Sequence, residues 1–147
     1  MRKAGRLRSA GGVVIKGSGD DLRIAVMRSG YDTWVFPKGG IESGETPQGA
    51  AAREIGEEIG VRPVALLSAL GDTEHEYTRE KTLHRKQVEW FLFRAGSEAE
   101  LSPNAHEDAL DCGWFAPKQA LSLLSHPDQR RILRRALSAL KPDTSSL

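Results

Sequence analysis

The stretch of residues 39–61 constrains this chain more than any other, because it predicts a helix with a recognisable signal at each end. Thr46 is a residue type preferred at the N-cap, and Pro47 suits the first helical position. Gly60 fits the C-cap, where glycine adopts the left-handed backbone conformation most easily. The sequence therefore predicts a helix that begins at Thr46 and ends at Gly60.

Three carboxylates lie on one face of this predicted helix. Glu54, Glu57 and Glu58 recur at spacings of three and four residues, so their side chains are neighbours on the helix surface. Like charges at this spacing repel each other, and a hard cation such as Mg²⁺, which prefers oxygen ligands, would offset the repulsion. The pattern alone allows two interpretations: a metal site, or a solvated acidic face opposite small apolar residues such as Ala50 and Ile55.

The residues around the carboxylates favour the metal site, because together they match a known motif. Its order is glycine, five residues, Glu, seven residues, Arg-Glu, an aliphatic residue, any residue, Glu-Glu, any residue, glycine and an aliphatic residue. The matching positions are Gly39, Glu45, Arg53, Glu54, Ile55, Glu57, Glu58, Gly60 and Val61. So many fixed positions rarely coincide by chance, which makes the motif far more specific than a short glycine pattern. The chain therefore resembles the Nudix hydrolases, which cleave a nucleoside diphosphate linked to another group.

The resemblance implies a fold and a metal site. The family fold is an α/β/α sandwich with a mixed central sheet. By this resemblance Glu54, Glu57 and Glu58 would bind Mg²⁺, with Mn²⁺ able to substitute, and one of the three would also act as the base that deprotonates water. A further metal ligand in the family often comes from a late loop. Glu107 is the candidate for it, and the alternative is a solvated loop residue.

The same resemblance assigns supporting roles around the carboxylates. Arg53 and Glu45 would be structural, with Arg53 pairing with a carboxylate to orient the loop before the helix. Gly39 and Gly40 would let the backbone pass close to the metal site.

The substrate has to be inferred from residues outside the motif, because fold and motif do not set it. Residues 34–40, Trp-Val-Phe-Pro-Lys-Gly-Gly, are similar to the corresponding stretch of bacterial diadenosine polyphosphate hydrolases. The first hypothesis is therefore Mg²⁺-dependent hydrolysis of a phosphoanhydride bond in diadenosine polyphosphates. Residues 79–86 resemble diphosphoinositol polyphosphate phosphohydrolases instead. A MutT-like nucleoside triphosphate pyrophosphatase and a non-catalytic nucleotide sensor are the remaining alternatives.

Cationic side chains outside the motif would offset the charge of a polyphosphate. Together with the two glycines, the residues expected to bind substrate are Arg8, Arg28, Lys38, Gly39, Gly40, His84 and Arg85. For each charged residue the alternative is a solvated loop or turn. The aromatic candidates for stacking on a base are Tyr31, Trp34 and Tyr77, and Trp34 is expected to pack against the fold instead.

Length and charge fit a single domain that acts on a small molecule. The 147 residues predict one domain over residues 9–141, with a basic arm at 1–8 and a flexible tail at 142–147. The net charge of +1 gives no bulk attraction to nucleic acid, so a small polyphosphate is the expected partner and nucleic acid is not. No apolar run approaches the roughly 18 residues of a membrane span. The single cysteine, Cys112, cannot form an internal disulfide, so a cytoplasmic location is expected, while the oligomeric state stays open.

Alternating elements predict a layered α/β domain. Strands are expected at residues 10–15, 22–27, 64–70, 88–93 and 113–115, and further helices at 118–124 and 128–140. Residues 34–40 are expected to form a loop or a strained strand end. Residues 71–86 are polar, and no strand is predicted there.

Overall fold

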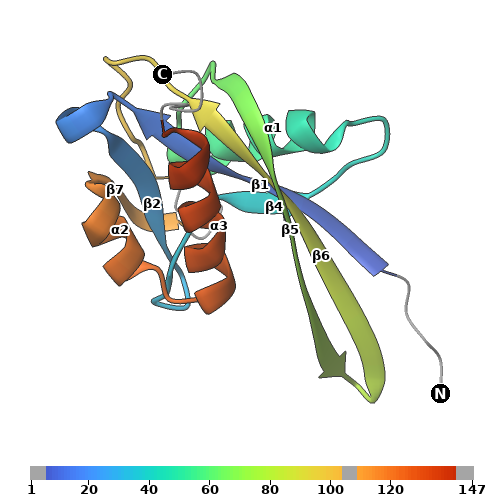
Figure 1. The fold of residues 1–147 in the computed structure, drawn as a ribbon. Helices are drawn as coiled ribbons and strands as arrows, with labels where there is room; N and C mark the ends of the chain where they lie inside the picture. Colours follow the sequence, from blue (N-terminus) through green and yellow to red (C-terminus); the bar gives the residue numbers. More distant parts are fainter. Residues whose placement is uncertain (1–5, 104–108, 142–147) are drawn as a thin grey trace.

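The computed structural model describes residues 6–103 and 109–141. A twisted sheet lies between α1 (Pro47–Ile59) on one side and α2 (Pro117–Leu123) with α3 (Pro127–Ala139) on the other (Figure 1). This layering confirms the predicted α/β class. Among the described residues, no helix has the length and hydropathy needed to cross a bilayer.

The sheet of the described residues has seven strands and is mixed. The strands are β1 (Arg6–Lys16), β2 (Arg23–Ser29), β3 (Trp34–Val35), β4 (Lys38–Gly40), β5 (Ala65–Arg79), β6 (Thr82–Arg94) and β7 (Ala109–Phe115). The order is β3-β2-β1-β6-β5, with β4 also paired to β1 and β7 to β2. β1 and β6 run parallel, and every other pair is antiparallel.

Two apolar clusters hold the layers together, one on each face of the sheet. Successive strand residues point to opposite faces, so β1 serves both clusters. Val13 packs with Trp90 and with Leu133 of α3, whereas Val14 packs with Ile55 of α1. Because these side chains are fully or almost fully buried, α1 is fixed firmly against the sheet.

The caps of α1 are those that the sequence predicts. The Thr46 side chain accepts a hydrogen bond from the Gly49 amide at 3.1 Å, and Pro47 is the first helical residue. Gly60 ends the helix with φ of 73°, a left-handed conformation that glycine adopts without strain. Ser102 lies so close that a Cβ at Gly60 would approach its side chain to 2.9 Å.

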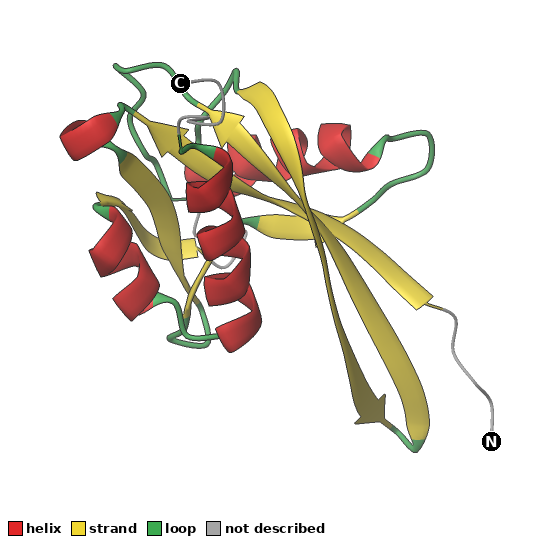
Figure 2. Cartoon of the chain, in the orientation of Figure 1, coloured by secondary structure: helices red, strands yellow, loops and turns green. Residues whose placement is uncertain are grey.

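The largest departure from the sequence-based prediction is the hairpin of β5 and β6. The predicted strands covered residues 64–70 and 88–93, but the two strands continue until Arg79 pairs with Thr82. The outer part projects well away from the body of the molecule (Figures 1 and 2). The prediction failed here because both faces of this segment are polar, so it lacks the alternation that marks a half-buried strand.

The turn of this hairpin carries no sequence signal either. Glu80 and Lys81 form the two-residue loop, and their φ angles are 51° and 63°. Positive φ at both positions defines a type I′ turn, which usually contains Asn and Gly. With Glu and Lys in these positions, the sequence does not indicate a tight turn.

Two shorter differences lie near the carboxylate helix. β1 begins at Arg6, so Arg8 lies in a sheet strand although the sequence places it in a basic arm. Residues 34–40, expected as a loop or strand end, form the short strands β3 and β4 around Pro37. β4 pairs with β1 through Ser9 and Gly40, and this pairing brings the glycines beside α1.

Candidate active site

Two of the three carboxylates of α1, Glu54 and Glu58, face the strand that precedes the helix. Glu54 and Glu58 are only 8% and 9% exposed, whereas 38% of the Glu57 side chain is exposed. Buried carboxylates require hydrogen bonds or opposite charges to offset the loss of hydration. The partners of these three side chains therefore show how the site is built.

The backbone of β4 runs directly against Glu54. A Cβ at Gly39 would overlap the Glu54 carboxylate group, whereas a Cβ at Gly40 would meet no atom within 4 Å. Only glycine fits at position 39 without a shift of the helix or the strand. The close approach places a strand backbone next to the carboxylates, as the family resemblance implies.

Arg53 connects the loop before the helix to the carboxylates. Its guanidinium donates to both oxygens of Glu45, at 2.8 and 2.9 Å, and to the Gly40 carbonyl oxygen at 2.9 Å. Its Nη1 also donates to Glu54 at 2.8 Å and to Glu57 at 3.2 Å. This planar group with several fixed donors can hold all four partners at once, which a lysine could not.

Glu45 is held as an anion by this arrangement. The hydrogen bond from Arg53 is the main cause that lowers the pKa of Glu45 to about 2, and a bond from the backbone of Glu42 adds to it. The pair with Glu45 also raises the pKa of Arg53. The loop of residues 40–45 is therefore fixed to α1 by a bidentate ion pair that persists over a wide pH range.

Glu58 joins the helix to the next part of the site. Its Oε2 accepts a hydrogen bond from the backbone amide of Lys38 at 3.1 Å. The Lys38 side chain itself has a pKa lowered to about 8, mainly by burial and then by the nearby Lys86, while Glu58 and Asp128 oppose the shift. Two lysines thus lie close together beside one of the carboxylates.

A cavity of about 800 Å³ opens beside Glu58. Thr73, Val88 and Trp90 form its floor, and Trp90 Nε1 donates to the Thr73 hydroxyl at 2.9 Å. The start of α3 forms one wall, where the buried Gln129 accepts from the Phe36 amide at 2.8 Å. A volume of this size is typical of sites for small organic ligands.

Comparison with known proteins identifies the family. The model of the NUDIX domain matches residues 5–136. The chain belongs to the Nudix family. It is a Nudix hydrolase, and its relatives include proteins named as pyrophosphohydrolases and phosphatases.

Two curated relatives illustrate how the Nudix domain is used. The chain is 34% identical over 134 residues to an RNA pyrophosphohydrolase of Rhizobium meliloti, a match that covers 80% of each chain. It is 36% identical over 115 residues to an 8-oxo-(d)GTP phosphatase of Mycolicibacterium smegmatis. That match covers 78% of this chain but only 33% of the longer relative.

Solved structures share the Nudix fold at low sequence identity. A binary complex of the C. elegans Ap4A hydrolase has a TM-score of 0.73 and 17% identity, covering 90% of this chain and 96% of that one. The E. coli dihydroneopterin triphosphate pyrophosphohydrolase has a TM-score of 0.71 and 21% identity, covering 87% and 92%. These likenesses confirm the fold.

The donor set of the site fits a hard cation in its chemistry. Nudix hydrolases generally use divalent metals. Glu54, Glu57 and Glu58 supply only carboxylate oxygens, the ligand type that such ions prefer. Within residues 6–103 and 109–141, however, no three acidic, His or Cys side chains are already arranged to hold an ion. Arg53 Nη1 lies between Glu54 and Glu57 and provides the positive charge there.

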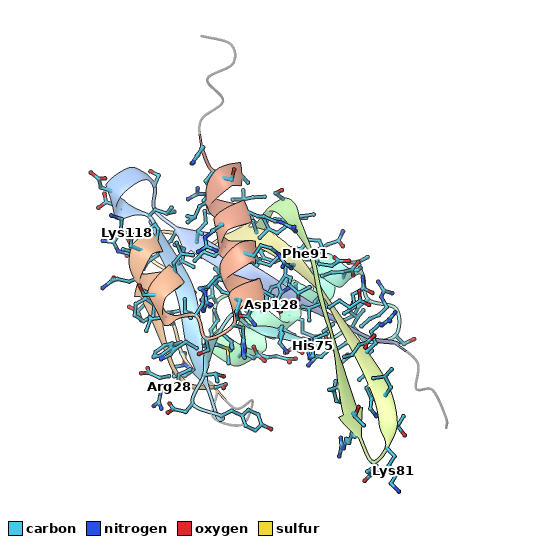
Figure 3. The ribbon with its side chains drawn as sticks, turned by 60° about the horizontal axis from the view of Figure 1, so that its bottom comes forward. Arg28, His75, Lys81, Phe91, Lys118 and Asp128 are labelled. Carbon is cyan, nitrogen blue, oxygen red and sulfur yellow. The ribbon has the colours of Figure 1, made fainter. Side chains whose placement is uncertain are left out.

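The structure does not bring all the predicted substrate-binding residues to the cavity. Lys38 lines it, whereas Arg28 lies at the surface in an ion pair with Asp32 at 3.1 Å (Figure 3). Arg8 pairs with Glu89 at 3.2 Å. Glu89 alternates along β6 with Val88 and Trp90, which line the cavity, so this pair lies on the opposite face of the sheet. Glu107 lies outside the described residues.

His84 and Arg85 lie on the projecting hairpin and point to opposite faces of it. The ring of His84 stacks on Tyr77, with centroids 5.0 Å apart. Arg85 forms ion pairs with Glu74 and Glu76, at 3.4 and 2.8 Å. Of the predicted stacking residues, Tyr31 lines the cavity and is 87% exposed, while Trp34 packs edge-on against Phe115.

Sequence reasoning missed the residues that complete the cavity. Asp128 and Gln129 lie at the start of α3, about ninety residues beyond Lys38 in the chain. The helical periodicity predicted α3 but gave no indication that its first turn faces β4. Lys86 lies in residues 79–86, the stretch that resembles diphosphoinositol polyphosphate phosphohydrolases. Its alternation with Val88 along β6 was the available signal that the two side chains share a face of the sheet.

Proposed function

We propose that this Nudix hydrolase cleaves a phosphoanhydride bond in diadenosine polyphosphates. The observation that carries the proposal is the continuity between the carboxylate face and the cavity. Glu58 lies on the wall of a cavity of about 800 Å³ that also contains Lys38 and Lys86. Carboxylates at one end and ammonium groups beside them suit a long polyanion cleaved at a fixed position.

Glu54, Glu57 and Glu58 are the residues that would hold Mg²⁺ or, in its place, Mn²⁺. Such an ion would neutralise the phosphate charge and lower the pKa of attacking water. Arg53 orients Glu54 and Glu57 through hydrogen bonds of 2.8 and 3.2 Å. A carboxylate of this group accepts the proton released as the water oxygen bonds to phosphorus and the bridging P–O bond breaks. The products are two fragments that each end in a phosphate.

Lys38 and Lys86 bind phosphates of the substrate that lie further from the cleaved bond. Both line the cavity beside Glu58, and both are partly buried. A second lysine near Lys38 raises the positive potential where a distant phosphate would lie. Longer phosphate chains therefore gain an interaction that a single diphosphate lacks.

A second candidate substrate is the 5′-triphosphate end of RNA. The specific observation in its favour is the relative named RNA pyrophosphohydrolase, because that match covers 80% of each chain. A MutT-like activity on 8-oxo-dGTP has weaker support, because the match to the relative named 8-oxo-(d)GTP phosphatase covers only 33% of that protein. A diphosphoinositol polyphosphate is less favoured, because Arg85 is paired with acidic residues and Lys81 lies at the hairpin tip (Figure 3).

One experiment separates these substrates. Purified protein with Mg²⁺, and in parallel with Mn²⁺, is given diadenosine tetraphosphate, a 5′-triphosphorylated RNA oligonucleotide, 8-oxo-dGTP and a diphosphoinositol pentakisphosphate. Products are separated by anion exchange, and kcat/KM values are compared under one condition. The proposal expects the dinucleotide to have the largest value. A larger value for any other compound would overturn it in favour of that substrate.

The Glu58→Gln variant tests the site itself. It keeps the size of the side chain and an oxygen that can accept from Lys38, but removes the negative charge. Turnover of the best substrate is expected to fall by orders of magnitude, with the unfolding temperature close to that of the wild type. An unchanged rate would remove Glu58 from the catalytic group, and a wild-type protein that binds nucleotide without turnover would be a sensor instead.

A further inference from the structure

The two faces of the projecting hairpin have different chemistry. Side chains alternate between faces along a strand, and paired residues of β5 and β6 share a face. Trp90, Val88 and Lys86 of β6 face the cavity, together with Thr73 and His75 of β5. Continuing outward in the same alternation, the next pair on this face is Tyr77 with His84. The floor of the cavity therefore continues along one face of the hairpin.

The opposite face carries charged and polar side chains that are partnered across the strands, together with the exposed Leu83. Arg85 bonds to Glu76 at 2.8 Å, and Gln87 bonds to Asp72 at 2.7 Å. The positive charge of Arg85 is thus compensated by its own hairpin. None of these four hydrogen-bonded side chains lines the cavity.

The face continuous with the cavity carries three rings instead. Tyr77 and His84 stack with centroids 5.0 Å apart and planes 15° apart. His75 lies 6.1 Å from Tyr77, and its side chain is exposed at the cavity wall. None of these rings belongs to either apolar cluster of the described residues. The rings extend outward from Lys86, which pairs directly with His75.

We propose that this ring face, defined as His75, Tyr77 and His84, binds the distal nucleoside of a dinucleoside polyphosphate. Lys86 binds the phosphate that precedes this nucleoside, and the rings stack against its base. Aromatic rings stack on any nucleobase, and Tyr77 lies two residues beyond His75, about 7 Å further along the strand. The inference rests on the proposed function, because it takes cleavage to occur at the Glu58 end of the cavity.

The position of the rings relative to the body supports one occupant. Figure 3 shows His75 on the part of the hairpin nearest the start of α3, where Asp128 is labelled, and Lys81 at the far tip. A nucleoside triphosphate bound by the carboxylates and lysines has its only base at one end of the chain. A dinucleoside polyphosphate has a second base at the other end, which needs a surface beyond the lysines.

The test compares two substrates with the same phosphate chain. Diadenosine tetraphosphate has the second nucleoside, and adenosine 5′-tetraphosphate lacks it. In Tyr77→Ala we expect KM for the dinucleotide to rise about tenfold, the effect of losing a stacked base. Both kcat values and the KM for the tetraphosphate should stay near those of the wild type. Equal losses with the two substrates would overturn the inference.

Two further variants separate recognition from hairpin stability, because cross-strand ring pairs also stabilise a hairpin. Tyr77→Phe keeps the ring and should retain the wild-type KM. Leu83→Ala truncates an exposed apolar side chain on the opposite face and should also retain it. A tenfold rise of KM in Leu83→Ala would show that any damage to the hairpin has this effect, and would refute the ring face as a subsite.

A binding measurement distinguishes failure of the inference from failure of the proposed function. A methylene-bridged analogue of diadenosine tetraphosphate, which is not hydrolysed, is titrated calorimetrically into wild type and Tyr77→Ala. Weaker binding to the variant supports the ring face even if the preferred substrate proves to be another compound. Equal binding to both proteins, or no binding to the wild type, overturns the inference. A Tyr77→Ala effect seen only with triphosphorylated RNA would also overturn it, in favour of an RNA nucleotide.

Discussion

Arg53 and Glu45 show how single residues hold the site together. The bidentate pair joins the loop of residues 40–45 to α1, and it depends on the charge of Glu45. Because the folded-state pKa of Glu45 is lowered from 4.5 to about 2, its stabilising contribution is fully present above pH 4.5. That contribution is lost as the pH falls toward 2.

Glu45→Gln should therefore destabilise the protein more at neutral than at acid pH. At pH 7 the variant lacks an ionised partner for Arg53. Near pH 3 the Glu45 carboxyl is protonated in the unfolded wild type but still mostly ionised in the folded one, so part of its stabilising contribution is already lost and the gap is smaller. Thermal unfolding at pH 7, 5 and 3 measures the gap between the two proteins. Glu42→Gln is the matched control, because Glu42 is exposed and 3.8 Å from Arg53. A gap that stays constant with pH would contradict the assigned role of the pair.

Gly39 is a second position where the surroundings determine which residue can be accommodated. Gly39→Ala would drive a methyl group into the Glu54 carboxylate, so either β4 or α1 must shift. Overpacking of this kind costs about 1–3 kcal/mol, and we expect a lower unfolding temperature together with a large loss of turnover. Gly40→Ala meets no atom within 4 Å, so its unfolding temperature should change little. Equal unfolding temperatures for Gly39→Ala and the wild type would show that the contact is not tight.

At the scale of elements, the parts predicted well are those specified locally. α1 is determined by Thr46, Pro47 and Gly60, all of which are within or next to the helix. The outer hairpin was missed because pairing such as that of Tyr77 with His84 leaves no apolar alternation in the sequence. The cavity wall of Asp128 was missed for another reason, since contacts between distant segments have no local pattern. The carboxylate pattern on α1 was identifiable because its spacing lies within one helix.

The N-cap of α1 allows a direct test of local stability. Thr46→Ala removes the oxygen that accepts from the Gly49 amide, and loss of such a cap costs about 1 kcal/mol. For a chain of this size the unfolding temperature should fall by about 3 °C. Thr46→Ser keeps the hydroxyl, and serine is at least as good an N-cap as threonine, so its unfolding temperature should stay close to that of the wild type. An unchanged temperature in Thr46→Ala would show that the rest of the fold holds the helix end without the cap.

At the scale of the whole molecule, stability and recognition occupy different parts of the chain. The two apolar clusters lie between the sheet and its helices, and none of residues 76–85 belongs to either cluster. The outer hairpin has exposed ion pairs, which contribute little to stability. The body should therefore fold without it, while the surface that extends the cavity would be lost.

A shortened hairpin tests this separation. His75 and Lys86 are paired residues, so an Asn-Gly dipeptide in place of residues 76–85 can close the strands with a type I′ turn. We expect cooperative thermal unfolding with a midpoint near that of the wild type, because both clusters remain intact. Trp90→Ala, which removes a side chain only 1% exposed, should lower the midpoint far more, by a loss of about 3–5 kcal/mol. Loss of cooperative unfolding in the shortened protein would mean that the outer hairpin is part of the structural core.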